Sequence, residues 1–181
     1  MSEELDVLKM VVQRLDSAGL PYMVTGSIAT NFYARPRMTR DIDIVIDLNP
    51  SGADRIGELF EGDFYVDREE VRRAVSQRSV FNIIHNEFII KVDFVIKKEA
   101  EYRQLEFQRR KRITIEDVPV AIVTPEDLIL SKLKWAQESH SEVQLGDVRN
   151  LIESVDTLDK PYLEEWVRKL GLGDLYREAL S

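Results

Sequence analysis

Two small residues and three aspartates are the positions best placed to do chemistry in this chain. Gly26 and Ser27 are followed, after thirteen intervening residues, by Asp41 and Asp43, which a single isoleucine separates, and Asp93 lies in a later apolar stretch. Carboxylates are ligands that Mg²⁺ and Mn²⁺ prefer. A glycine and a serine where a helix begins suit phosphate groups. A set of this kind is suited to metal-assisted chemistry on a nucleoside triphosphate.

The segment from Asp41 to Asp47 alternates between apolar and acidic residues, as a half-buried strand does. Its three isoleucines fall on one face, and Asp41, Asp43, Val45 and Asp47 fall on the other. At about 3.3 Å per residue, Asp41 and Asp43 start about 6.6 Å apart. Their carboxylates can therefore converge on two ions about 3.5–4 Å apart. We interpret Asp47 as a solvated acid at the far end of the strand.

The third aspartate lies in the segment Phe88–Ile96, whose alternate residues form a continuous apolar face. Asp93 lies on the opposite face, between Lys91 and Val95. An unpaired charge in so apolar a run costs several kcal/mol or more unless it is paired or bound to a metal. A third metal ligand would explain this acid.

The residues around Gly26 predict a strand, a tight turn and a helix. The strand covers Tyr22–Thr25, and the helix runs from Gly26 to about Ala34, because Pro36 stops it. Free N–H groups at the helix start, the glycine and the Ser27 hydroxyl make an anion site suited to β- and γ-phosphates. Three arginines lie between this turn and the acidic strand, of which the one beside Asp41 is a candidate nucleotide-binding residue: Arg35, Arg37 and Arg40.

These parts resemble the signature of the DNA polymerase β-like nucleotidyltransferase superfamily. The run from Gly26 to Asp43 is also similar to the small bacterial branch that includes the AbiEii-type toxins of abortive-infection and toxin–antitoxin systems. The resemblance implies that Asp41 and Asp43 hold two Mg²⁺ (or Mn²⁺) ions and that Asp93 holds the catalytic one. It also implies that Gly26 and Ser27 bind the triphosphate of an NTP substrate.

Two later segments resemble degenerate motifs of the same branch. One runs from Thr124 to Lys132 and the other begins at Asp147. For Lys132 two interpretations stay open, the polar edge of an amphipathic helix or a phosphate contact, and we include it among the candidate nucleotide-binding residues. Gly146 stands where the branch has a lysine. The role of Asp147 is therefore left open.

Composition favours a cytoplasmic protein without a membrane segment. No apolar run approaches the roughly 20 residues that span a bilayer, and the acidic start is not a signal peptide. There is no cysteine, so a zinc site has almost no material. A net charge of -8 argues against broad binding of a phosphate backbone. The basic run Arg109–Arg112 is interpreted as a solvated face, with contact to a nucleic-acid acceptor as the alternative.

The expected fold is α+β, with a mixed β-sheet nucleotidyltransferase core flanked by helices and a small helical C-terminal subdomain. The expected domains are 1–123, which is catalytic, and 124–181. Further strands are expected at 80–84, 113–115 and 118–123, and a His85-Asn86 turn should join the first of these to Phe88–Ile96. Expected helices cover 3–18, 51–60, 67–78, 100–111, a segment from Thr124 and Pro125 onward, 141–155, 161–170 and 174–179. Trp135 and Trp166 are expected in the core.

The expected activity is transfer of a nucleoside monophosphate from an NTP to an acceptor hydroxyl on a tRNA end, a protein or a small molecule. The enzyme could be the toxin of a toxin–antitoxin pair, with an antitoxin as partner, or a transferase of the antibiotic-modifying kind. The alternative from another class is a non-catalytic relative that binds a nucleotide or a partner. All three acids are present, which favours the enzyme.

Overall fold

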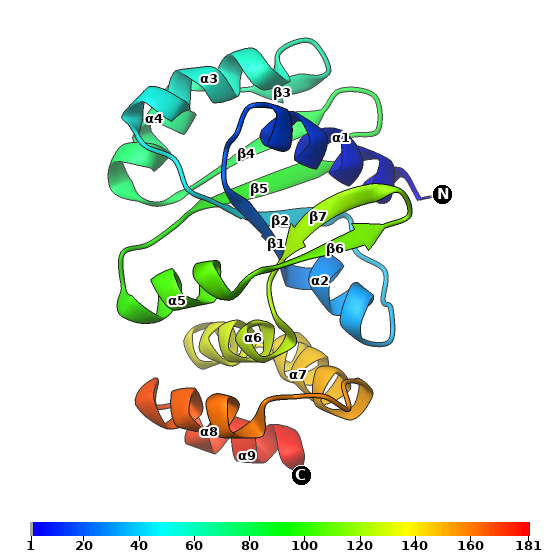
Figure 1. Cartoon of the computed structure of the whole chain (residues 1–181), viewed down its shortest axis with the longest axis vertical. Helices are drawn as coiled ribbons and strands as arrows, with labels where there is room; N and C mark the ends of the chain where they lie inside the picture. Colours follow the sequence, from blue (N-terminus) through cyan, green and yellow to red (C-terminus); the bar gives the residue numbers. More distant parts are fainter. Residues whose placement is uncertain (1) are drawn as a thin grey trace.

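The sheet is mixed, and its strands are joined by helices on both sides (Figure 1). The structure is a computed structural model that describes residues 2–181. In that part of the chain the sheet has seven strands in the order β3-β4-β5-β2-β1-β7-β6. The pairs β2–β5 and β1–β7 are parallel and the others are antiparallel. The strands are β1 (Tyr22–Thr25), β2 (Asp41–Ile46), β3 (Phe64–Val66), β4 (Val80–His85), β5 (Lys91–Ile96), β6 (Lys111–Ile115) and β7 (Val118–Ile122). This confirms the α+β class.

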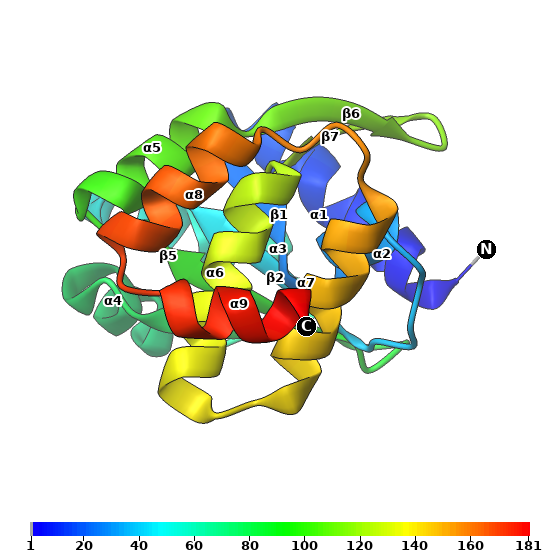
Figure 2. The same ribbon diagram turned by 90° about the horizontal axis from the view of Figure 1, so that it is seen from below.

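Helices lie at both ends of the molecule. They are α1 (Glu3–Ser17), α2 (Gly26–Tyr33), α3 (Pro50–Phe60), α4 (Arg68–Gln77), α5 (Glu101–Arg109), α6 (Pro125–Ser139), α7 (Glu142–Ser154), α8 (Lys160–Lys169) and α9 (Gly173–Leu180). In Figure 1, α1, α3 and α4 lie above the sheet and α6 to α9 below it. Figure 2 shows these last four helices from below, as a layer in front of the strands. None of the helices in residues 2–181 has the length and apolar character needed to cross a membrane.

The alternation along β2 divides its two faces as expected. Ile42, Ile44 and Ile46 are completely buried, whereas Asp43 is half-buried and Asp41 exposed. Helix α1 packs on this sheet through five completely buried residues: Val7, Leu8, Val11, Val12 and Leu15. Burying apolar side chains on one face of β2 leaves its acidic face toward the other side of the sheet.

The hairpin between β4 and β5 differs from the expected one. His85 ends β4 and is buried, stacked on Phe88 and edge-on to Phe64, and does not lie in the turn. Strand β5 begins at Lys91 and not at Phe88, because Ile89 takes a left-handed backbone conformation with φ 52°. The connection is longer than two residues, and alternation alone does not reveal where pairing stops.

Strand β3 is absent from the sequence prediction. Its three residues are too few to show an alternation, and they form a strand by pairing with β4. One of the two tryptophans was also placed wrongly. Trp166 is buried against Tyr102, but Trp135 is 55% exposed, because it lies on the outer side of α6. The domain boundary after residue 123 stays a prediction.

Candidate active site

Two of the three acids face each other across neighbouring strands. In the parallel pair β2–β5, Asp43 is in register with Asp93, and Asp41 with Lys91. Neighbouring strands lie about 4.8 Å apart, so the backbones of Asp43 and Asp93 are close. Both side chains are half-buried on the face opposite the isoleucines. The register therefore brings the acids of two distant sequence segments to one place.

Lys91 contributes a positive charge to these acids. Its Nζ lies 2.8 Å from Oδ2 of Asp93 and 4.0 Å from Oδ2 of Asp41. Within residues 2–181 no three His, Cys, Asp or Glu side chains stand grouped so as to hold a metal ion as they are. The Lys91 ammonium therefore already neutralises part of the charge of the acidic cluster, and the Asp93 carboxylate is paired with it.

The backbone conformation at position 26 and the close approach of the Asp43 side chain both require a glycine there. Its φ is +63°, a conformation that L side chains rarely adopt. A Cβ at this position would lie 2.7 Å from Cγ of Asp43 and nearer still to Oδ2. Thr25, the last residue of β1, pairs with Asp43. The glycine therefore lets the Asp43 carboxylate lie directly against the turn that starts α2.

The start of α2 carries the expected serine. No side chain caps this helix terminus, which leaves its first N–H groups for another acceptor. The Ser27 hydroxyl accepts a hydrogen bond of 2.8 Å from Nη2 of Arg37. Arg40 lies exposed in the loop before β2. The Gly26 turn, the Ser27 hydroxyl and the Asp43 side chain therefore lie close together at the end of β1.

A buried aspartate organises the positive charges beside this turn. Asp147 of α7 accepts hydrogen bonds from Arg37 at 2.9 Å (Nε) and 3.0 Å (Nη2), and from Nζ of Lys132 at 2.7 Å. Lys132 is only 4% exposed and also donates to Gln144. It does not lie on a solvated helix face. The network links α6, α7 and the loop after α2 to the Ser27 hydroxyl.

The electrostatics of the acidic cluster favour a bound cation. Burial raises the pKa of Asp43, and the neighbouring Asp93 and Asp41 raise it further, while Lys132 and Lys91 oppose the shift. The carboxylates are hard oxygen donors of the kind that divalent magnesium and manganese take. The residues present therefore suit such an ion.

Arg37 and Asp147 are the site residues that the sequence analysis did not assign. The signal for Asp147 was its spacing, since it lies four residues before the buried Leu151 on the inner face of α7. Lys132 likewise lies four residues after Leu128, on the buried face of α6. Opposite charges on the buried faces of two successive helices indicate an ion pair. Arg37 had no comparable signal, because it lies in a loop.

Solved structures of similar fold identify the architecture. An antigenic nucleotidyltransferase-like protein from Paracoccidioides brasiliensis aligns over 97% of this chain and 93% of its own, with 19% identity and a TM-score of 0.59. The antibiotic-resistance factor ANT(2'')-Ia aligns over 97% and 96%, with 16% identity and a TM-score of 0.61. The lincosamide antibiotic adenylyltransferase LnuA, solved with lincomycin bound, aligns over 86% and 98%, with 14% identity and a TM-score of 0.56.

The chain therefore has the nucleotidyltransferase fold. This confirms the fold that the resemblance implies. No protein-family profile and no curated protein matches the sequence. The narrower resemblance to AbiEii-type toxins stays a prediction.

Proposed function

We propose that the chain is a metal-dependent nucleotidyltransferase that moves a nucleoside monophosphate from an NTP to an acceptor hydroxyl. The observation that carries this proposal is the position of Asp43, which is in register with Asp93 and lies against the Gly26 turn. Acids and a phosphate-binding turn must be adjacent if one substrate is to contact both. The similar folds of known adenylyltransferases support the same class of reaction.

The reaction forms a bond between the acceptor oxygen and the α-phosphorus and breaks the bond from that phosphorus to the oxygen that bridges it to the β-phosphorus. Pyrophosphate leaves with the electron pair, and the hydroxyl proton is released to water. Asp41, Asp43 and Asp93 would hold two divalent ions, whose charge lowers the acceptor hydroxyl's pKa and neutralises the phosphates. The N–H groups at the start of α2 and the Ser27 hydroxyl would orient the departing phosphates.

The network behind the turn would position the serine and supply positive charge. Arg37 holds the Ser27 hydroxyl, and Asp147 holds Arg37 through two hydrogen bonds. Lys132 is fixed by the same carboxylate, within electrostatic reach of Asp43. Positioning and charge neutralisation would provide most of the rate enhancement. Arg40, exposed beside β2, would add a contact to the nucleotide.

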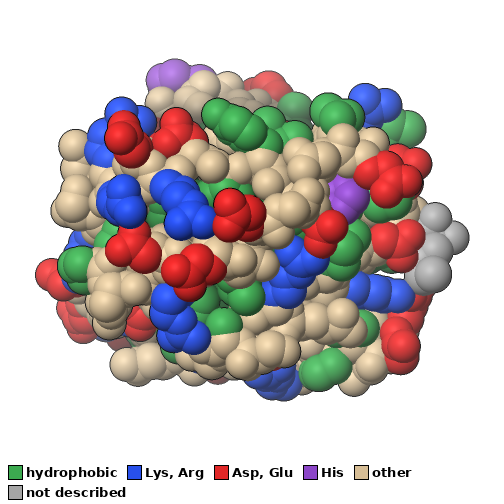
Figure 3. All heavy atoms as spheres, turned by 90° about the horizontal axis from the view of Figure 1, so that it is seen from above, with side chains coloured by type: hydrophobic (Ala, Val, Ile, Leu, Met, Phe, Trp, Pro, Cys, Tyr) green, Lys and Arg blue, Asp and Glu red, His purple; other side chains and the backbone are tan. Residues whose placement is uncertain are grey.

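The acceptor is a hydroxyl of a tRNA end, a protein or a small molecule. ANT(2'')-Ia is an antibiotic-resistance factor and LnuA is a lincosamide antibiotic adenylyltransferase, which favours a small molecule. The AbiEii-like run favours the toxin of a toxin–antitoxin pair, with an antitoxin as partner. The molecule shows no broad basic face on its upper side, where Figure 3 shows Lys and Arg interspersed with Asp and Glu.

Transfer of label from NTP tests the activity and the acceptor together. The protein is incubated with each α-labelled NTP, Mg²⁺ and, in turn, total tRNA, cell lysate protein and small alcohols. We expect label in one acceptor class with wild type and none with Asp43→Asn. Asp156→Asn, which changes an exposed acid, should keep full activity. Absence of label in all three classes, or equal labelling by Asp43→Asn, would contradict the proposal.

A non-catalytic nucleotide-binding relative is the second candidate, and the contact of Lys91 with Asp93 favours it. A fixed ammonium would replace a metal ion there. If the acids bind metal, Lys91 only competes with it, and Lys91→Met should tighten Mn²⁺ binding about two- to fivefold, since a partly exposed ion pair contributes roughly 0.5–1 kcal/mol. If Lys91 replaces the metal, wild type should not bind Mn²⁺ at millimolar concentration.

A further inference from the structure

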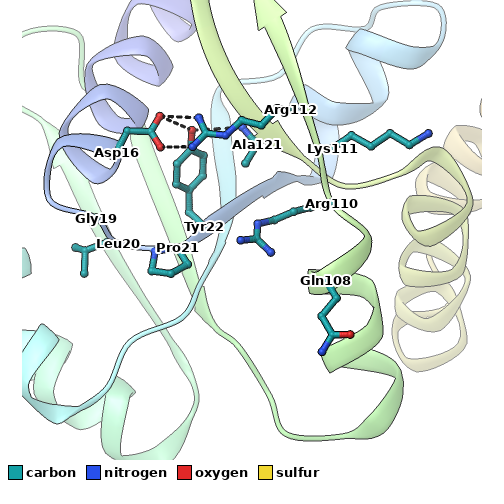
Figure 4. Close-up of a pocket in the computed structure, with 10 residues that line it drawn as sticks. All are labelled: Asp16, Gly19, Leu20, Pro21, Tyr22, Gln108, Arg110, Lys111, Arg112 and Ala121. Atoms are coloured by element: carbon teal, nitrogen blue, oxygen red, sulfur yellow. Dashed lines mark hydrogen bonds and ion pairs between the residues drawn. The ribbon is translucent and has the colours of Figure 1, made fainter.

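A cavity lies at the opposite end of β1 from the candidate active site. It has a volume of about 470 Å³ and lies between the end of α1, the start of β1 and the start of β6 (Figure 4). Gly19, Tyr22 and Arg110 are among the residues that line it. Tyr22 is separated from Gly26 by about 13 Å along the strand. The volume is within the range of small-molecule sites.

One wall of this cavity is electrically neutral and held in place. Arg112 of β6 makes a bidentate pair with Asp16, with distances of 2.7 and 3.0 Å. The Tyr22 hydroxyl donates to Asp16 at 3.3 Å and accepts from the N–H of Ala121 at 3.3 Å. These contacts join α1, β1, β6 and β7. The guanidinium of Arg112 is therefore already neutralised by a carboxylate.

Arg110 differs from both neighbouring arginines. Arg109 pairs with the buried Asp127 at 3.0 Å, and Arg112 pairs with Asp16. Arg110 donates to the carbonyl of Phe107 at 2.5 Å, and its guanidinium lies 4.1 Å from the centre of that ring. In the described residues it has no carboxylate within ion-pair distance, and Figure 4 shows its guanidinium pointing into the cavity. The basic run is thus not one solvated face.

An anion in this cavity would complete the coordination of Arg110. Burial lowers the pKa of Arg110, and the neighbouring Arg112 lowers it further, because both disfavour its positive charge. A guanidinium offers five donors, which match the oxygens of a phosphate or a carboxylate in pairs. Charge distinguishes these two groups. Among the lining residues, Arg112 is paired with Asp16 and Figure 4 shows Lys111 extending away from Arg110, so the Arg110 guanidinium supplies the uncompensated positive charge that faces the cavity.

We propose that this cavity binds the phosphate of a phosphomonoester, at a site separate from the Gly26 turn. A phosphomonoester carries about −1.5 to −2 charges at pH 7 and would attract the unpaired guanidinium more strongly than a carboxylate, which carries one. Arg110 would hold the phosphate in a fork, and Gln108 would donate its amide to it. The ligand is a free small phosphomonoester or the 5′-phosphate of an RNA, which share this chemistry. The site does not depend on the proposed transfer reaction.

Amide chemical shifts of the full-length ¹⁵N-labelled protein test the proposal. Glycerol 3-phosphate is the probe, because it has no base for a nucleotide site, and glycerol and acetate are the controls. We expect saturable shifts of the Gly19 and Ala121 amides with glycerol 3-phosphate alone, while the Gly26 amide stays unchanged. Shifts at Gly26 without shifts at Gly19, or equal shifts with acetate, would overturn the proposal. RNA with and without a 5′-phosphate distinguishes the two sources.

Substitution of Arg110 gives the second arm. Arg110→Gln should weaken binding at least tenfold, whereas Arg73→Gln, which removes the same charge from the exposed surface of α4, should leave it unchanged. Where Arg110→Gln loses the spectrum of the folded protein, Arg110→Lys takes its place, and loss of the fork should weaken binding at least threefold. Unchanged affinity in the folded Arg110 variant would overturn the proposal.

Discussion

Asp43 carries a charge that its surroundings disfavour. It is half-buried against the Gly26 turn, and Asp93 and Asp41 are its nearest acids. Burial, followed by these two acids, raises its pKa above the ordinary value of 3.8. The folded state then binds a proton at this carboxyl more tightly than the unfolded state does. The related stability is present below the ordinary pKa and is lost as pH rises through the folded pKa.

Asp43→Asn should therefore stabilise the metal-free protein at neutral pH. The substitution removes a charge with little change of shape, and a gain of about 1 kcal/mol corresponds to about 2–4 °C in Tm at this size. We expect the variant to melt at least about 2 °C above wild type at pH 7 in chelator, with a smaller difference near pH 4. Differential scanning calorimetry measures this. Asp156→Asn is the control, and a lower Tm of Asp43→Asn at pH 7 would show that Asp43 stabilises the fold.

Helices α6 and α7 contact the Gly26 turn and the helix that follows it through charged side chains as well as through apolar packing. Burial raises the pKa of Asp147, but hydrogen bonds from Arg37 and Lys132 outweigh it and lower the pKa. That contribution to stability is present above the ordinary pKa of an aspartate and is lost as pH falls through the folded pKa. The side chains of Lys132 and Asp147 are 4% and 5% exposed, so each buried charge is stabilised by the opposite charge of its partner.

A double-mutant cycle measures the interaction free energy between Lys132 and Asp147. Asp147→Leu should cost about 3–5 kcal/mol, because it leaves Lys132 buried without its acid. Lys132→Met combined with Asp147→Leu should cost clearly less than the sum of the single substitutions, with a coupling of at least about 1 kcal/mol. Urea unfolding gives these values. The exposed pair Glu165–Lys169 is the control, with coupling below about 0.5 kcal/mol. Additive costs at Asp147 and Lys132 would contradict the buried pair.

The elements that position the acids were predictable, whereas their partners were not. Strand β2 and the Gly26 turn follow from alternation and from a glycine at a helix start, both of which are local patterns. The register that sets Asp43 beside Asp93 depends on pairing between strands fifty residues apart in the chain. The sequence therefore reveals the two acids but not that they face each other. The same holds for Lys91 and Arg37, whose partners are chosen by tertiary packing. His85 shows a different error, because it was expected in the turn, whereas it ends β4 and is buried.

The two predicted domains share one interior. Buried residues of the segment 1–123 and of the segment 124–181 belong to one hydrophobic cluster. The Asn150 side chain donates to the carbonyl of Arg35 at 2.9 Å, and its amide oxygen accepts from the N–H of Arg35 at 3.3 Å. The network of Arg37, Asp147 and Lys132 crosses the same boundary. The helical segment therefore contributes residues to the candidate active site.

Thermal unfolding of the whole chain should occur in one transition. A shared core and shared ion pairs couple the two segments, so the calorimetric enthalpy should equal the van't Hoff enthalpy. Calorimetry with the full chain measures both. Two separate transitions would instead show that the boundary after residue 123 divides two independent folding units.

The most direct test of the central proposal is binding of Mn²⁺ in the presence of an NTP analogue with a non-transferable α–β methylene bridge, because this test requires no acceptor. Water proton relaxation counts the bound ions. We predict about two ions per wild-type chain, loss of at least one in Asp43→Asn and in Asp93→Asn, and the full number in Asp156→Asn. If Asp43→Asn and Asp93→Asn bind as many ions as wild type with the same affinity, the three aspartates are not the metal site and the proposed mechanism is wrong.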